Sequence, residues 1–256
     1  MFYLIGIGLN SKQLTFEALE AIQKSRKVFF EAYTSAFAEG SIKELEETCK
    51  KKFLELNRKG VEEGFELILK EAKNSNEDIA LLVFGNALNA TTHVQLLIEA
   101  KKLSLKCKVI PGISIFDYLA ETGLDAYKFG RVCTIVKPKK NFAPEDFFDV
   151  IEKNSSMGLH SLCLLEIDSE QGYQMSVAEA VKILHEIAQK RKSRLIDSAV
   201  FIGLYALGSK EQKTKKGSLK EFLLSSYSGF PQSLVVCGKL NEKEKEALKE
   251  LHGAEI

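Results

Sequence analysis

Strand-like and helix-like segments alternate along the whole chain of 256 residues. The clearest strand signal is residues 78–84, Asp-Ile-Ala-Leu-Leu-Val-Phe, because a nearly continuous apolar run of this length is expected for a central strand covered on both faces. Further strands are predicted at residues 2–8, 27–33 and 107–110. Such alternation is typical of parallel or mixed sheets covered by helices, so the predicted fold class is α/β.

Capping residues mark the predicted helix starts. Thr15 is expected to cap a helix whose apolar residues recur at helical spacing. Ser41 and Glu44 fit a capping box. The helix that follows is predicted to have one apolar face, formed by Ile42, Leu45, Cys49, Phe53 and Leu56. Other helices of this half are predicted at residues 61–72, at 92–103 and from 114.

The second half keeps the alternation with different lengths. Its predicted helices are residues 144–154, 176–192, 218–224 and 242–252, and its predicted strands are residues 131–136, 160–167, 199–207 and 233–237. The lysine-rich stretch 213–220 is interpreted as a solvated face or loop. Residues 137–141 together with Pro144 have the composition of a linker. We therefore predict an N-terminal α/β domain at 1–138 and a C-terminal α/β domain at 139–256.

Composition excludes several classes of protein. A formal net charge of +1 gives no electrostatic reason to expect a nucleic-acid binder, and no apolar stretch reaches membrane-spanning length. No metal site is expected, because no Cys-x-x-Cys pair occurs and His160 and Cys163 would face opposite sides of a strand. The five separated cysteines are typical of reduced core thiols in a cytosolic protein; they are Cys49, Cys107, Cys133, Cys163 and Cys237.

Two loops are candidate ligand sites, since open α/β sheets bind ligands beyond the carboxyl ends of their strands. Gly6 and Gly8 close the first strand, but they form a weak dinucleotide fingerprint because Ser11 stands where its third glycine belongs. Residues 85–93 follow the buried central strand and are small and polar. Thr91 or Thr92 in this loop is also a candidate helix cap.

At this point the sequence resembles the diphthine synthase family, within the tetrapyrrole-methylase-like class of methyltransferases. Three strings are specific to that family: Glu-Ala-Tyr-Thr-Ser at 31–35, Ala-Thr-Thr-His at 90–93 and Tyr-Lys-Phe-Gly at 127–130. Further strings in the same order are residues 2–9, 114–115, 122–124, 158–160 and 238–240. The resemblance therefore covers nearly the whole chain.

The resemblance implies a fold, a reaction and partners. The fold would be two α/β domains of the tetrapyrrole methylase type with the cofactor cleft between them. The cofactor would be S-adenosyl-L-methionine, with S-adenosyl-L-homocysteine as its product. The acceptor would be the amino group of the 3-amino-3-carboxypropyl-histidine of translation elongation factor 2, methylated on the way to diphthamide. The resemblance further implies a cytoplasmic homodimer without a nucleic-acid or membrane partner.

Residue by residue, the resemblance assigns donor contacts to Leu9, Asn86, Asn89, Ser114, Ile115, Leu165, Leu207 and Gln232. Asn86 stands where the family usually has aspartate, and Gln232 stands where it commonly has histidine. Glu31, Tyr33 and His93 are polar candidates near the implied cleft. No catalytic base is assigned among them, because each can equally be structural.

Two alternative functions stay open at this level. One is a methylase of the same fold with another acceptor, such as a tetrapyrrole. The other is a homologue that binds the elongation factor without turnover. The number of methyl groups transferred, and methylation of a carboxylate, are also left open.

Overall fold

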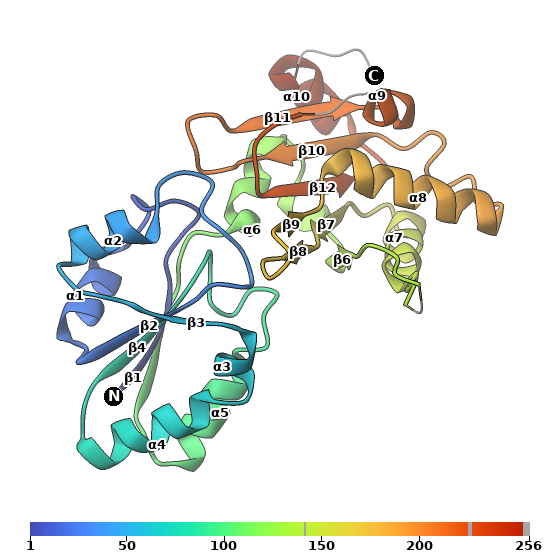
Figure 1. Ribbon diagram of the computed structural model, residues 1–256. Helices are drawn as coiled ribbons and strands as arrows, with labels where there is room; N and C mark the ends of the chain where they lie inside the picture. The colour runs from blue at the N-terminus through green and yellow to red at the C-terminus, as the bar shows by residue number, and fades with distance from the viewer. Residues whose placement is uncertain (141, 225–226, 253–256) are drawn as a thin grey trace. The chain divides into compact units, whose positions relative to one another are not determined.

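The computed structural model describes residues 1–140, 142–224 and 227–252, and the chain divides into two compact units, Met1–Asp117 and Tyr118–Ile256 (Figure 1). Both units are α/β, as predicted. The division comes earlier than the predicted boundary at 138/139, because strand β6 (Cys133–Ile135) pairs with β7 (Ser161–Leu165) in the second sheet. The stretch of linker composition is thus a loop of the second unit; its last residue, Asn141, lies outside the described residues.

The first unit contains a five-stranded parallel sheet in the order β3-β2-β4-β1-β5. Its strands are β1 (Phe2–Gly6), β2 (Lys27–Glu31), β3 (Leu54–Leu56), β4 (Ile79–Val83) and β5 (Cys107–Ile110). The predicted apolar run at 78–84 contains β4, which is indeed central in the sheet. All five residues of β4 are buried, as a strand covered on both faces requires.

Side chains of this sheet alternate between two apolar layers. Phe2 and Leu4 of β1 pack with α3 (Arg58–Glu62), α4 (Phe65–Ser75) and α5 (Val94–Lys102). Tyr3 and Ile5 pack on the opposite face with α1 (Phe16–Lys24) and α2 (Ile42–Cys49). The unit is therefore a sheet between two helical layers, and its ligand-binding edge is the edge where the strands end.

The caps predicted at Thr15 and Ser41 are confirmed, but the cap predicted at Thr91 or Thr92 is wrong, because α5 begins after His93 and no side chain caps it. One helix is also shorter than expected. The hydroxyl of Thr15 accepts the Ala18 N–H at 3.1 Å, and that of Ser41 accepts the Glu44 N–H at 3.2 Å. The prediction that the second helix continues to Leu56 is wrong: it ends at Cys49, where Lys50 adopts φ +52°. The chain then forms β3, whose backbone pairs with β2, so an apolar spacing that fits a helix belongs partly to a strand.

The second unit contains a mixed sheet in the order β11-β10-β12-β7-β6. Only β6 and β7 are parallel; β10 (Phe201–Tyr205), β11 (Lys213–Gly217) and β12 (Gln232–Val236) make antiparallel pairs. A short hairpin, β8 (Ile167–Asp168) and β9 (Tyr173–Gln174), lies outside it. The short helix α6 (Ile115–Tyr118) spans the end of the first unit, and η1 (Leu119–Thr122) and η2 (Ala126–Lys128) lie near the start of the second.

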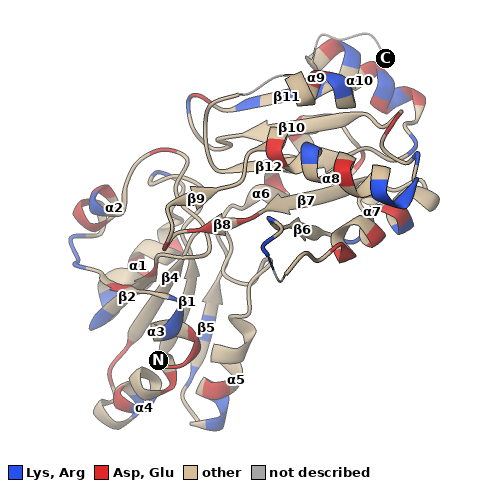
Figure 2. Ribbon diagram, turned by 45° about the vertical axis from the view of Figure 1, so that its right-hand side comes forward, with Lys and Arg blue, Asp and Glu red and all other residues tan. Residues whose placement is uncertain are grey.

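The lysine-rich stretch that starts at residue 213 has the solvated face that was predicted as one alternative, but this face belongs to a strand and not to a loop. β11 is an edge strand, and basic residues colour part of it blue in Figure 2. Lys213 and Lys215 on this strand are exposed. Charged side chains on an edge strand oppose pairing with another chain. The high lysine content therefore makes the strand difficult to recognise in the sequence. In the fold, the same lysines protect the edge of the sheet from pairing with another chain.

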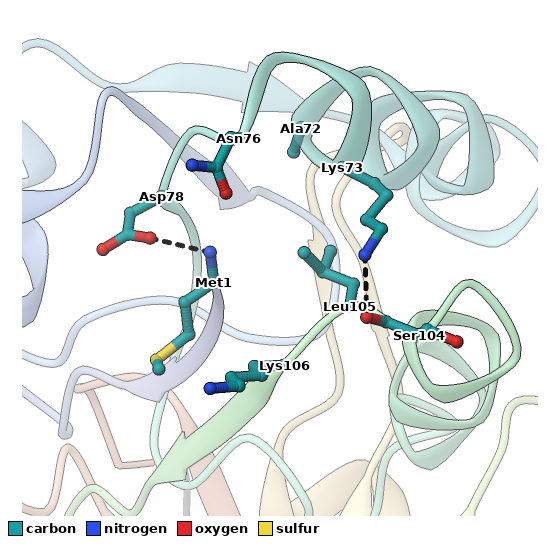
Figure 3. A pocket seen from close by; sticks show the side chains of 8 residues that line it. All are labelled: Met1, Ala72, Lys73, Asn76, Asp78, Ser104, Leu105 and Lys106. Carbon is teal, nitrogen blue, oxygen red and sulfur yellow. Dashed lines mark hydrogen bonds and ion pairs between the residues drawn. The ribbon is translucent and has the colours of Figure 1, made fainter.

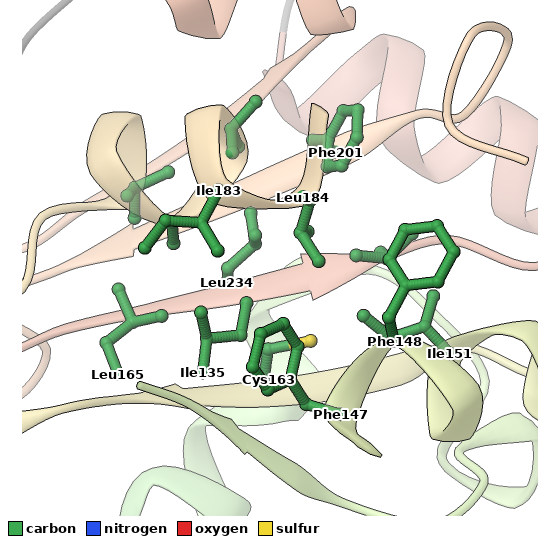
Figure 4. Packing of buried hydrophobic residues seen from close by; sticks show 14 of the residues in the cluster. Ile135, Phe147, Phe148, Ile151, Cys163, Leu165, Ile183, Leu184, Phe201 and Leu234 are labelled. Atoms are coloured by element: carbon green, nitrogen blue, oxygen red, sulfur yellow. The ribbon is translucent and has the colours of Figure 1, made fainter. Parts of the chain in front are cut away.

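The core of the second unit lies between its sheet and α7 (Asp146–Ser156), α8 (Val177–Arg191) and α9 (Leu219–Leu224) (Figure 4). Phe147 and Phe148 of α7, Leu184 of α8 and Leu234 of β12 are almost fully buried there. The five cysteines are free thiols, and all except Cys107 are buried. This agrees with the prediction that the cysteines are mostly core residues.

Three of the strings that carry the family resemblance meet in one buried network beside α10 (Glu242–His252). The Gly238 N–H donates to Nδ1 of His160 at 3.0 Å, so Nε2 carries the ring proton and donates to Glu244 at 2.9 Å. Lys128 donates to the other oxygen of Glu244. Burial lowers the pKa of His160; burial opposes ionisation of Glu244, but hydrogen bonds from Lys128 and its other donors hold the Glu244 pKa at about 2.

Removal of the Glu244 charge is expected to destabilise the protein. Glu244→Gln should lower the free energy of unfolding at pH 7 by roughly 2–3 kcal/mol, since Lys128 loses its buried partner. The ionised carboxylate stabilises the native state above the unfolded pKa of about 4.3, and this contribution is lost as the pH falls toward 2. Urea unfolding at pH 7, 5 and 3 should therefore show a steeper loss for the wild type than for the variant.

Glu246→Gln is the matched control, because Glu246 lies on the same helix in an exposed ion pair with Lys243. Surface pairs of this kind contribute little to stability. Equal effects of the two substitutions would contradict a special role for the buried network.

Candidate functional site

Three glycines bring the carboxyl ends of three neighbouring strands into backbone contact. Gly6 ends β1, Gly85 follows β4, and Gly112 follows β5. A Cβ placed on Gly112 would lie 2.3 Å from the carbonyl oxygen of Gly85 and 2.5 Å from the carbonyl carbon of Gly6. Only glycine leaves room for this approach, so the loops after β1, β4 and β5 start from one point.

The loops that follow are joined by a short antiparallel bridge. The N–H of Gly85 donates to the carbonyl of Gly8 at 2.8 Å, and the N–H of Gly8 donates to the carbonyl of Gly85 at 3.2 Å. Both glycines have positive φ angles, +83° for Gly8 and +66° for Gly85. A Cβ on Gly85 would meet Leu9 Cδ2 at 3.9 Å and Ser114 Cβ at 3.7 Å. The missing side chain of Gly85 therefore leaves a small hollow between Leu9 and Ser114.

Ser114 joins the loop after β5 to the loop after β4. Its hydroxyl accepts a hydrogen bond from Asn89 Nδ2 at 3.1 Å. Its N–H and hydroxyl both donate to one carboxylate oxygen of Asp117, at 2.7 and 3.0 Å. Asp117 was not among the predicted site residues. The spacing Ser114-x-x-Asp117 resembles a capping box and is the signal in the sequence that could have identified it.

Asn86 shapes the loop between β4 and α5. Its side-chain oxygen accepts the Leu88 N–H at 3.1 Å, and its carbonyl accepts the Asn89 N–H at 3.1 Å. Ile115 begins α6 next to Ser114 and is half-buried. The structure thus brings together four of the five predicted donor residues of the first unit around Gly85, namely Leu9, Asn86, Asn89 and Ser114, with Ile115 next in the chain.

The three predicted donor residues of the second unit lie at one edge of its sheet. Leu165 ends β7, and Leu207 follows β10. Gln232 begins β12, which runs antiparallel to both of these strands, so its start pairs with Tyr205 near the end of β10. All three residues are buried.

The side chain of Gln232 makes hydrogen bonds within the second unit. Its oxygen accepts the Val177 N–H at 2.8 Å at the start of α8, and its nitrogen donates to the carbonyls of Gly229 at 2.9 Å and Tyr227 at 3.2 Å. These bonds satisfy a buried amide and one of the free N–H groups of the helix start. The main chain is therefore the part of Gln232 that a ligand contact would use.

A cavity of about 320 Å³ lies at the opposite edge of the first sheet, among the strand starts (Figure 3). Two pairs of its polar groups bond to each other: the Met1 amino group contacts Asp78 at 2.7 Å, and Lys73 donates to the Ser104 carbonyl at 3.1 Å. Ligands of such sheets bind at the carboxyl edge. This cavity is therefore not the candidate site.

Within residues 1–140, 142–224 and 227–252, no group of three or more His, Cys, Asp or Glu side chains could bind a metal ion. In the same ranges, no helix combines the length and the apolar character needed to cross a membrane.

Comparisons with known proteins agree with this architecture. The sequence profile of the family Tetrapyrrole (Corrin/Porphyrin) Methylases matches residues 1–223. A diphthine synthase from Methanococcus vannielii is 34% identical over 253 residues, which are 98% of each chain. A diphthine methyl ester synthase from Dictyostelium discoideum is 34% identical over 264 residues, covering 96% of each chain. A crystal structure of diphthine synthase superposes with a TM-score of 0.86 and 28% identity, covering 98% of this chain and 96% of that one.

The chain therefore belongs to the tetrapyrrole methylase family and is a methyltransferase by fold and by family. Within this family it belongs with the diphthine synthases, which it matches over nearly its whole length. The resemblance that the family strings indicated is confirmed.

Enlarging Gly112 is expected to disrupt the glycine contact on which the site depends. In Gly112→Ala the new methyl group meets main-chain atoms of Gly85 and Gly6, which cannot rotate away as a side chain would. We expect a loss of about 2–3 kcal/mol in the free energy of unfolding, measured by thermal or urea unfolding. Gly172→Ala is the control, because its Cβ would meet nothing within 4 Å and only its positive φ would cost about 1 kcal/mol. Equal losses would contradict a tight contact at Gly112.

Proposed function

We propose that this protein methylates the amino group of the 3-amino-3-carboxypropyl-histidine of translation elongation factor 2, with S-adenosyl-L-methionine as the methyl donor. The observation that carries the proposal is the 34% identity to diphthine synthases over nearly the full length of both chains. The Gly85 cluster at the carboxyl edge of a parallel sheet supports it, because this edge is where such sheets bind ligands.

The residues around Gly85 fit a donor with polar and cationic groups. The hollow beside Gly85 lets a ligand approach the backbone between Leu9 and Ser114. Polar groups of Asn86 and Asn89 lie on the loop, and the Asp117 carboxylate held by Ser114 supplies a nearby negative charge. In the proposed site Leu9, Asn86, Asn89, Ser114 and Ile115 hold the donor. Leu165, Leu207 and Gln232 stay predicted contacts from the second unit.

The donor supplies a methyl group on a positively charged sulfur when it is bound. The protein has to hold an amine in line with that methyl group and to exclude water. It must also remove a proton, because an ammonium group has no free electron pair with which to attack. Positioning and proton removal are thus the tasks of this chain's own residues.

The remaining partners follow from the family resemblance. We propose that the enzyme acts as a homodimer in the cytoplasm, on a protein substrate. The number of methyl groups is a question for experiment, because the relatives include both a diphthine synthase and a diphthine methyl ester synthase.

Mass spectrometry tests the reaction directly. Elongation factor 2 carrying the aminocarboxypropyl-histidine should gain whole methyl increments, confined to that residue, when incubated with the protein and S-adenosyl-L-methionine. Ile115→Arg places a charged side chain next to Ser114 and should abolish both methylation and the binding of S-adenosyl-L-homocysteine in calorimetry, while the protein stays folded. Absence of increments in the wild type, with donor and factor both bound, would favour a non-catalytic homologue.

The charge of residue 86 should influence donor affinity. Asn86→Asp keeps the oxygen that accepts the Leu88 N–H and adds a negative charge near a cationic donor. We expect the Kd to fall severalfold, which corresponds to roughly 1 kcal/mol at a partly exposed position. Titration calorimetry at low and high salt measures the effect, and an equal or weaker affinity would contradict the charge argument.

A further inference from the structure

A second polar cluster lies at the same carboxyl edge of the first sheet, beside the predicted donor residues. Glu31 is the last residue of β2, and His93 precedes the first turn of α5. Their side chains are 0% and 2% exposed, and Nε2 of His93 lies 2.9 Å from Oε2 of Glu31. Because β2 pairs with β4, this contact joins two of the family-specific strings, those at 31–35 and 90–93.

The hydrogen-bonding capacity of this pair is largely unused. Within the described residues, Oε2 of Glu31, both ring nitrogens of His93 and the hydroxyl of Tyr33 are buried without a hydrogen-bond partner. Nε2 and Oε2 are thus in contact but not aligned as donor and acceptor. Only Oε1 of Glu31 accepts a bond, from the Thr34 hydroxyl. Buried polar groups are normally satisfied, so a cluster of exceptions calls for a functional explanation.

The His160–Glu244 pair shows what a structural pair of this kind looks like in the same chain. Its Nε2–Oε1 distance is also 2.9 Å and its side chains are equally buried. There, however, both ring nitrogens of His160 are hydrogen-bonded, and Glu244 also accepts from Asn241 and Asp125. Both pairs consist of a histidine and a glutamate. They differ because the ring nitrogens of His160 have hydrogen-bond partners and those of His93 have none among the described residues.

A pocket of about 280 Å³ between α3 and α5 leads to His93. Apolar walls are formed by Val61 and Leu96, and Glu62 and Glu99 add carboxylates. The nearby cation is Arg58, which stacks 4.9 Å above the Tyr33 ring and lies 3.4 Å from Glu62. Glu62 and Glu99 line the pocket and Glu31 contacts His93, so these carboxylates outnumber the Arg58 guanidinium and the pocket favours a cationic group.

The pocket is connected to the loop that carries the predicted donor residues. His93 follows Asn89 by four positions, and the Thr91 hydroxyl donates to the carbonyl of Ala87 at 2.6 Å, which folds the loop back on itself. Ala87 is buried in the same apolar cluster as Tyr33, Val61 and Leu96. One loop therefore carries Asn89, which donates to Ser114, and leads directly into His93.

We propose that this pocket receives the ammonium group of the acceptor and that the Glu31–His93 pair accepts its proton. The proposal rests on the proposed function, since it names the proton acceptor of that reaction. Nδ1 of His93 takes the proton, which frees the electron pair on the amine nitrogen, and the Glu31 carboxylate stabilises the imidazolium from the side of Nε2.

The remaining steps balance in the same way. A carbon–nitrogen bond forms while the carbon–sulfur bond breaks, and the bonding pair stays on the sulfur. The product is again an ammonium, which loses its next proton to His93 after the ring has released the first one to water through the pocket. Tyr33 stays neutral throughout, because burial and the Glu31 charge raise its pKa.

The pH dependence of methylation tests the proton acceptor. His93→Gln and Glu31→Gln should lower the rate at pH 7 by at least about 100-fold. The residual rate should rise about tenfold per pH unit, because the variants depend on the spontaneously neutral amine. Binding of S-adenosyl-L-homocysteine should change less than twofold, which shows that the variants are folded. His160→Gln should lower stability and leave the shape of the pH profile unchanged.

A second measurement does not require activity. The compound 2-aminobutyrate contains the amine and carboxylate of the aminocarboxypropyl group, and its addition should shift the ring ¹⁵N signals of His93 but not those of His160. Glu62→Gln combined with Glu99→Gln should weaken this response severalfold.

Each result has a defined meaning. The proposal would be overturned if His93→Gln and Glu31→Gln kept the pH profile of the active wild-type enzyme. It would also be overturned if 2-aminobutyrate did not shift the ring ¹⁵N signals of His93. Shifted His93 signals in a wild-type protein that transfers no methyl group would support the pocket and refute the proposed function instead.

Discussion

Backbone contact among Gly6, Gly85 and Gly112 is the constraint on which the first unit's binding edge depends. The strands that these glycines follow are parallel, so their loops leave the sheet on the same side. Because no Cβ separates the three chains, the loops start close together and the bridge between Gly8 and Gly85 can form. The hollow between Leu9 and Ser114 is a direct result.

Local hydrogen bonds then give each loop its shape. Asp117 holds Ser114, Ser114 accepts from Asn89, and Asn86 closes a turn on Leu88. These side chains are short and bond within a few residues or to the adjoining loop, so they keep little freedom. A site built in this way is preorganised, which is what methyl transfer between two positioned groups requires.

Two buried His–Glu contacts show how environment separates a structural pair from a reactive one. Both ring nitrogens of His160 and both carboxylate oxygens of Glu244 are hydrogen-bonded, and the pair anchors α10 to the sheet through Glu244. Around His93 the partners are missing among the described residues, and a pocket reaches the ring. Buried polar atoms without hydrogen-bond partners lower the stability of the fold. A ligand that donates a hydrogen bond or a proton to the Glu31–His93 pair would restore this stability.

The sequence by itself determined the elements with strong local signals. The apolar run of β4 and the caps at Thr15 and Ser41 depend on interactions within a few residues of the chain, so they were predicted correctly. The family strings identified the family, although their residues make contacts with distant parts of the chain. It did not reveal β3 or β11: Leu56 fits the spacing of a helix face, and the lysines of β11 are typical of a loop. Both strands form by backbone pairing with a neighbouring strand: β3 pairs with β2, and β11 pairs with β10.

Tertiary structure alone decided which distant residues meet. The approach of Gly112 to Gly85, the contact of Glu31 with His93, and the capture of the Gln232 amide by the start of α8 all depend on strand order and direction. Local patterns carry no information about strand order, because a parallel strand looks the same beside any neighbour. The physical reason is that periodic burial and helix capping involve residues close together in the sequence, whereas a site is formed by contacts between residues far apart in the sequence.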